Sequence, residues 1–315
     1  MDKFLQALNE CSRVNYNLDG DGICSYLLLK KAFPMIEFGG FTNSDKMILS
    51  RNGNDWREFS TLFIDIFLKD DNLWSLDQHI YLNKCDEDVY SRKINPHGLI
   101  EERRASDASY CMKYPFSTAH FILASLERNG LISDELPFEE EIEAMSNSMV
   151  KITFGDLFMN LDGVLSNYLK YEKNVREWAP RLIKYSNNGK NTTKMFEYLF
   201  SKSPKDFVQT DKIIRGFYMS YGLEDDGGFN PAISMEENIR LIENLKRSFN
   251  KYIGATLDSS SVELYEYIGD RKVVQINESS KLVGCDTFAY VGKNKLSYTS
   301  DIKQSGNGYN FKIFV

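Results

Sequence analysis

The sequence is poor in histidine and has no excess of positive charge. Its 315 residues include three histidines, and all three lie between His79 and His120, so imidazole chemistry is expected only in that window. The formal net charge is −7 at pH 7. This excludes a protein that binds nucleic acid through a broadly basic surface, but it is compatible with nucleotides held locally through metal ions.

Paired cysteines and long hydrophobic runs are also missing. The five cysteines are scattered without a C-x-x-C pair, which indicates buried free thiols rather than a disulfide framework. Residues 1–14 are polar and lack the apolar core of a signal peptide. The longest apolar stretches, such as 61–68, have the length of a strand, whereas a membrane-spanning helix needs roughly 20 apolar residues. The sequence therefore predicts a cytoplasmic protein that does not enter the membrane.

The apolar content is sufficient for a core, and the length predicts two domains or one domain with a large appendage. Residues 1–190 have the alternating pattern of an α/β domain, for which we expect a parallel sheet with helices on both faces. Residues 191–254 are expected to form a helical connector. Residues 255–315 contain short β-like runs separated by Gly, Asn, Ser and Asp, which predict a smaller α+β domain.

Three strands are expected in the first part, at 14–17, 61–68 and 74–76. A helix is expected over 23–33, where Pro34 ends it. Because ligands of parallel sheets bind beyond the carboxyl ends of the strands, polar residues that follow these strands are the candidates for a site.

Acidic residues follow each of these strands. Asp19-Gly20-Asp21-Gly22 brings two carboxylates onto one tight loop, and its glycines allow a ligand to approach closely. Asp65 interrupts an otherwise apolar strand, where a buried carboxylate is costly unless it is paired or metal-bound. Asp77-Gln78-His79 follows the next strand. Hard divalent cations prefer such oxygen ligands, although each motif alone is also compatible with a helix cap or a surface turn.

Taken in this order and spacing, the motifs resemble the DHH phosphoesterases. The segment Asn15 to Ser25 resembles the first motif of that family, Asp65 the second and Asp77-Gln78-His79 the third. Asp156 is the best candidate for the fourth motif, with Asp162 as the alternative. The resemblance covers roughly residues 12–165, and by it residues 255–315 resemble a shortened accessory substrate-binding domain.

The resemblance implies a two-metal enzyme that uses Mn²⁺ or Mg²⁺. By it, Asp19 binds one cation, Asp21 and Asp156 bind the other, and Asp65 bridges both. His79 contacts the scissile phosphate and Asp77 orients its neighbours. Two such cations generate a hydroxide and neutralise the attacking and leaving oxygens. The implied substrates are nucleotides, cyclic dinucleotides or short single-stranded nucleic acids.

The sequence departs from the family pattern at two ligand positions, where Asn15 and Gln78 replace histidines. Both changes exchange an imidazole nitrogen for an amide, whose oxygen suits Mg²⁺ better than the softer transition metals. Three interpretations remain open at this point: a site adapted to Mg²⁺, a nitrogen supplied by another histidine, or a decayed site in a protein that binds a nucleotide or protein partner without turnover. A single-strand-specific exonuclease is a further alternative.

Four residues outside the motifs are candidates for binding substrate: His97, Arg103, Arg104 and His120. Guanidinium groups suit phosphates, but a solvated run of charges explains the arginines equally well. His97 is also compatible with a loop position and His120 with a packed or capping position on a helix over 117–126. The sequence permits a homo-oligomer but does not require one.

Overall fold

The computed structural model describes residues 2–42, 46–50, 60–66, 72–78, 92–100, 114–142 and 152–257, together with the backbone of strands between 264 and 314. The chain divides into two compact units. Unit 1 consists of Met1–Asn17, Met35–Tyr114 and Asp258–Val315, and unit 2 consists of Leu18–Pro34 and Pro115–Leu257. The domain boundaries expected at residues 190 and 254 stay predictions.

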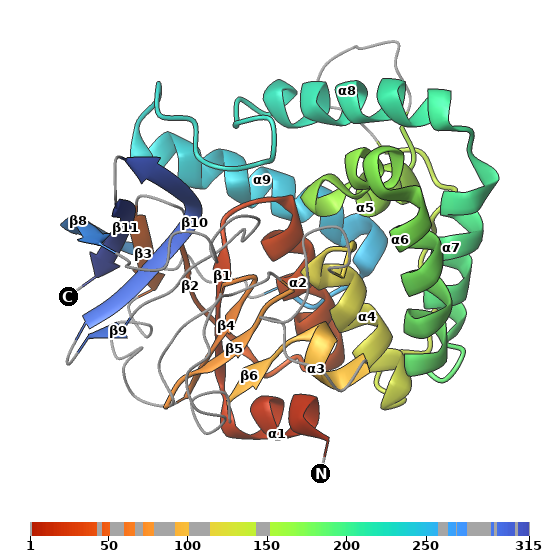
Figure 1. Ribbon diagram of the computed structural model, residues 1–315, viewed down its shortest axis with the longest axis horizontal. Helices are drawn as coiled ribbons and strands as arrows, with labels where there is room; N and C mark the ends of the chain where they lie inside the picture. Colours follow the sequence, from red (N-terminus) through yellow and green to blue (C-terminus); the bar gives the residue numbers. More distant parts are fainter. Residues whose placement is uncertain are drawn as a thin grey trace. The chain divides into compact units, whose positions relative to one another are not determined.

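Unit 1 contains a seven-stranded sheet with the order β6-β5-β4-β1-β2-β3-β7. Strands β6, β5, β4, β1 and β2 run parallel to one another (Figure 1). Strands β3 and β7 extend the sheet beyond β2 through antiparallel pairings. The strands are β1 (Arg13–Asn17), β2 (Glu37–Thr42), β3 (Lys46–Ser50), β4 (Thr61–Ile64), β5 (Trp74–Leu76), β6 (Lys93–Ile94) and β7 (Leu264–Ile268). This confirms an α/β fold with a parallel sheet. Helices α1 (Lys3–Glu10) and α3 (Pro96–Ile100) belong to the same unit.

The central strands form because nearly every side chain in them can be buried. All four residues of β4 and the three central residues of β1 are buried, as expected for a parallel sheet covered on both faces. Tyr16 of β1 packs against Phe38 and Phe41 of β2, with ring centroids 5.7 and 6.2 Å apart. The expected strand over 61–68 ends earlier, at Ile64, because Asp65 adopts a φ of 56° that no strand continues through.

The last part of the chain adds further strands. A second, antiparallel sheet has the order β8-β11-β10-β9, formed by β8 (Asp270–Gln275), β9 (Val291–Gly292), β10 (Lys295–Ser305) and β11 (Gly308–Phe314). Strand β7 instead pairs with β3 in the larger sheet. Strands β8, β10 and β11 fall where β-like runs were expected, and the resemblance to an accessory domain stays a prediction.

Unit 2 is helical. Its helices are α2 (Gly20–Ala32), α4 (Thr118–Arg128), α5 (Phe154–Met159), α6 (Val164–Tyr185), α7 (Lys190–Ser201), α8 (Pro204–Ser220) and α9 (Met235–Ile253), with a short 3₁₀ helix at Leu161–Gly163. Helix α2 is buried along most of its length and packs against α4 and α9. Among the described residues, no helix combines the length and apolar character that crossing a membrane would require.

Candidate functional site

A row of polar residues lines the carboxyl ends of the parallel strands in unit 1. The strands are aligned so that Tyr16 pairs with Ile64, Ile64 with Leu76 and Leu76 with Ile94. The residue that follows each of these four is polar. These residues, which we call the polar row, are Asn17, Asp65, Asp77 and Asn95. They occupy the edge of a parallel sheet at which ligands bind.

Asp65 is the most constrained member of the polar row. Its left-handed backbone turns the chain as β4 ends, while its N–H still donates to the carbonyl of Leu76 at 2.8 Å. Its side chain is only 3% exposed, and Oδ2 accepts a hydrogen bond from Nδ2 of Asn17 at 3.2 Å. Asp65 is therefore hydrogen-bonded to residues of both neighbouring strands. The only local sequence signal for this turn is that Asp65 interrupts an apolar run.

Asp77 and Gln78 are buried where β5 ends. The N–H of Asp77 donates to the carbonyl of Ile94 at 3.0 Å, and Nδ2 of Asn95 donates to the carbonyl of Asp77 at 2.7 Å. Asn95 thus fixes the backbone of the motif that resembles the third DHH motif. His79, the proposed catalytic partner of Asp77, lies outside the described residues.

Asn15 is buried in the middle of β1, and of its two side-chain amide atoms only Oδ1 has a hydrogen-bond partner among the described residues. Oγ1 of Thr42 donates to Oδ1 of Asn15 at 3.0 Å, while Nδ2 of Asn15 has no hydrogen-bond partner among the described residues. The two ends of an amide have the same shape. A half-turn would let Nδ2 donate to Thr42 and would leave Oδ1 without a partner. Asn15 can therefore present an oxygen ligand without any change in its packing.

The Asp19-Gly20-Asp21-Gly22 loop opens helix α2 in unit 2. Asp19 is the N-cap residue, and its Oδ1 accepts from the N–H of Gly22 at 2.8 Å. Burial raises the pKa of Asp19 well above its usual range, and the negative charges of Asp21, Asp226 and Asp162 raise it further. Asp162, the alternative candidate for the fourth motif, is therefore close enough for its charge to raise the pKa of Asp19.

Asp21 is engaged in a contact that its motif did not predict. Its carboxylate is 2% exposed and accepts hydrogen bonds from the N–H groups of Thr118 and Ala119, both at 2.8 Å, and from Oγ of Ser25 at 3.4 Å. Thr118 and Ala119 form the first turn of α4. Asp21 thus satisfies the N-terminal N–H groups of a second helix, where negative charge is favourable.

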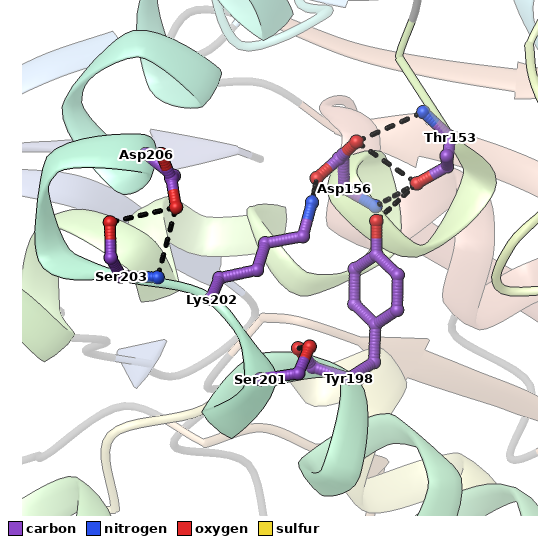
Figure 2. Close-up of polar contacts among 7 residues, drawn as sticks. All are labelled: Thr153, Asp156, Tyr198, Ser201, Lys202, Ser203 and Asp206. Atoms are coloured by element: carbon purple, nitrogen blue, oxygen red, sulfur yellow. Dashed lines mark hydrogen bonds and ion pairs between the residues drawn. The ribbon is translucent and has the colours of Figure 1, made fainter.

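Asp156 is likewise held within unit 2, and Figure 2 shows its partners. Oδ2 accepts from the N–H and Oγ1 of Thr153 at 3.0 and 2.9 Å in a capping box at the start of α5, and Oδ1 forms an ion pair with Lys202. Burial by itself would raise the pKa of Asp156, but the bonds and charge of Lys202 and the bonds of Thr153 lower it. The carboxylate predicted to complete a metal site already has a lysine as its cation.

A cavity of about 610 Å³ lies close to this cluster in unit 2. Tyr198 and Ser201 line it together with residues 135–140. The hydroxyl of Tyr198 also forms a hydrogen bond with Oγ1 of Thr153. Nζ of Lys202 lies over the Tyr198 ring, 4.5 Å from its centroid. None of the predicted site residues lines this cavity.

The two histidines that the structure describes are both buried. Nε2 of His97, on α3, accepts from the N–H of Tyr114 at 3.0 Å. Nδ1 of His120 accepts from the N–H of Ser117 at 3.1 Å, so Nε2 carries the proton and bonds to the carbonyl of Phe158 at 2.8 Å. His120 is therefore a capping residue of α4, the alternative that the sequence left open, and neither of its nitrogens is left for a phosphate. Arg103 and Arg104 lie outside the described residues.

Two residues near Asp19 were not among the sequence candidates. The carbonyl of Asp226 accepts from the N–H of Gly20 at 2.9 Å. Tyr218 of α8 lies so close to Gly20 that a Cβ there would be 2.1 Å from its hydroxyl oxygen. Burial, followed by the charges of Cys24, Asp19, Asp226 and Asp21, raises the pKa of Tyr218 well above its usual range. The acidic, glycine-rich run over 224–228 resembles the composition of 19–22 and is the signal that could have identified this segment.

The predicted metal ligands are divided between the two units. Asn15, Asp65 and Gln78 belong to unit 1, and Asp19, Asp21 and Asp156 belong to unit 2. Within the described ranges, no three His, Cys, Asp or Glu side chains gather into a group that could hold a metal ion. The oxygen donors of Asn15, Asp65 and Gln78 nevertheless have the chemistry that hard cations require, and half of the Asn15 amide is unused.

Comparison with known proteins identifies no relative. No protein-family model matches the sequence, and no curated protein or solved structure is similar enough to count as a match. The functional argument therefore depends on the residues themselves.

Proposed function

We propose that this protein is a metal-dependent phosphoesterase of the DHH type, which hydrolyses phosphodiester bonds of nucleotides, short oligonucleotides or cyclic dinucleotides in the cytoplasm. The observation that carries the proposal is the polar row, and within it the buried carboxylate of Asp65. A left-handed aspartate at the end of a buried strand is costly in both conformation and solvation. Such a residue is typical of a functional site.

The side chains around Asp65 and Asn15 suit the role of ligands to a hard cation. Within unit 1, the oxygens of Asn15, Asp65 and Gln78 would hold one cation. Within unit 2, the carboxylate of Asp19 is a candidate cation ligand in its own right. Bound cations would neutralise the substrate phosphate and activate a water molecule. The remaining residues position these ligands: Asn17 orients Asp65, and Thr42 orients Asn15. His79 is proposed to contact the scissile phosphate, and Asp77 to orient its neighbours.

The test is a hydrolysis screen combined with metal analysis. The purified protein is incubated with mononucleotides, dinucleotides, cyclic dinucleotides and short single strands, each with Mg²⁺ and with Mn²⁺. We expect hydrolysis of at least one class, with Mg²⁺ effective because amide oxygens replace imidazole at Asn15 and Gln78. Absence of both metal uptake and hydrolysis would contradict the proposal.

A second candidate function is binding without turnover. It is favoured by the internal use of two of the four carboxylates that the resemblance assigns to metal, since Asp21 holds α4 and Asp156 holds Lys202. A protein of this kind would bind a nucleotide or a protein partner as a sensor. Calorimetry that detects nucleotide binding in the absence of hydrolysis would select this alternative.

A further inference from the structure

The hydroxyl of Tyr218 lies at the first turn of α2, beside Gly20. The side chain is 4% exposed, and its hydroxyl has no hydrogen-bond partner among the residues that the structure describes. Gly20 is the residue that lets it approach, because any Cβ at that position would overlap the hydroxyl oxygen. The hydroxyl therefore keeps its hydrogen-bonding capacity for a ligand.

The ring of Tyr218 is held firmly, so the position of its hydroxyl is fixed. Phe217 and Phe249 pack edge-on against it, with ring centroids 5.7 and 6.3 Å away. Two backbone N–H groups of this turn are already used, since Gly20 donates to the carbonyl of Asp226 and Gly22 donates to Asp19. The Tyr218 hydroxyl, by contrast, can still donate a hydrogen bond.

We propose that Tyr218 is a substrate-binding residue, whose hydroxyl donates a hydrogen bond to a phosphate oxygen of a ligand bound at the first turn of α2. This inference rests on the proposed phosphoesterase function, because an anion approaches these carboxylates only when cations neutralise them. A phenol is a neutral donor at physiological pH. It therefore recognises a phosphate oxygen without competing with the cations for Asp19.

The test compares Tyr218→Phe with Tyr221→Phe. Tyr221 is also 4% exposed, lies at the end of the same helix and packs against the same Phe217 with ring centroids 5.2 Å apart, so it is a matched loss of one buried hydroxyl. KM for the best substrate and the Kd for AMP with Mg²⁺, measured by calorimetry, should both rise about tenfold in Tyr218→Phe, as expected for one hydrogen bond to a charged group. Tyr221→Phe should leave both unchanged, and kcat should change less than KM.

Other outcomes separate this inference from the proposed function. If the wild-type protein hydrolyses substrate but the two variants have the same KM and Kd, only the role of Tyr218 is wrong. If the wild-type protein neither hydrolyses nor binds any nucleotide, the proposed function fails first. Melting temperatures of both variants are measured alongside. A much larger loss in Tyr218→Phe than in Tyr221→Phe, or failure to fold, would show that the hydroxyl has a structural partner and would overturn the inference.

Discussion

The carboxylate of Asp21 accepts a hydrogen bond of 2.8 Å from the backbone N–H of Thr118, a residue 97 positions later in the chain. This contact ties the first turn of α2 to the first turn of α4 inside unit 2. It assigns a structural task to a residue that the D-x-D-G motif marks as a metal ligand.

Asp21→Asn is therefore expected to destabilise the protein even without metal. The variant keeps one acceptor oxygen but turns an amide N–H₂ toward a backbone N–H, so we expect a loss of about 2–3 kcal/mol in the free energy of unfolding. Urea denaturation in buffer containing a chelator measures it, with the exposed Glu236→Gln as the control. Equal stability of the two variants would show that Asp21 is not needed to hold α4.

Glu127 provides an independent case of the same arrangement. Its carboxylate accepts from the N–H groups of Asn191 and Thr192 at 2.6 and 2.9 Å and from Oγ1 of Thr192 at 2.6 Å, at the start of α7. Glu127→Gln is expected to lose about 2 kcal/mol of stability, for the same reason. Because no resemblance assigns Glu127 to catalysis, the kcat of the Glu127→Gln protein should equal that of the wild type. A change in kcat without a change in stability would contradict this.

Asp65→Asn tests the proposed active site without disturbing the turn. Asparagine tolerates the left-handed backbone nearly as well as aspartate, so the fold should be retained. Loss of the charge should lower the rate of hydrolysis at least about 100-fold, as removal of a group that stabilises charge in the transition state does. Hydrolysis and circular dichroism are measured on the same samples. Activity within a few-fold of wild type would remove Asp65 from the site.

The lowered pKa of the buried His120 predicts how the stability of the protein depends on pH. Burial lowers its pKa from 6.5 to about 3, against the opposing hydrogen bond to Phe158. The folded protein thus binds this proton less readily than the unfolded chain. The stabilisation is complete above pH 6.5 and is lost as the pH falls toward 3, at about 1.4 kcal/mol per pH unit. His120→Gln keeps an acceptor for the capping box and should lack this part of the slope between pH 6 and 4. Parallel slopes in the two proteins would refute the prediction.

The contact between Gly20 and Tyr218 predicts a non-additive pair of substitutions. Gly20→Ala should cost about 1–3 kcal/mol, because its Cβ overlaps the Tyr218 hydroxyl. Adding Tyr218→Phe removes the overlapping oxygen, so the double variant should be more stable than the sum of the single effects requires. Chemical denaturation of the four proteins gives this coupling energy. Strict additivity would mean that the hydroxyl moves aside freely.

Much of the architecture could be predicted from the pattern of apolar residues. The strands at β1, β4 and β5 and the helix α2 lie where the sequence predicts them, because burial in a parallel sheet or along a helix imposes a recognisable pattern. The antiparallel partner of β3 could not be predicted. Strand β7 lies more than 200 residues away in the chain, and only tertiary packing specifies that pairing.

The candidate site was predictable only in part, for a related reason. The motifs identify which carboxylates are unusual, but a buried carboxylate can be stabilised by a cation or by helix N–H groups. Asp21 has the N–H groups of α4 and Asp156 has the ammonium group of Lys202, and both partners are remote in sequence. Tyr218 carries no local signal, since a tyrosine in an amphipathic helix is typical of any core.

The division of the chain into two interleaved units has a consequence for its synthesis. Unit 2 begins at Leu18 but is complete only when Leu257 has been made, and unit 1 still awaits β7 after that. Neither unit can therefore finish folding while the ribosome is making the first 250 or so residues. A nascent chain of that length lacks the end of α9 and leaves β3 without its partner β7, and it is the stage at which we expect chaperones to bind.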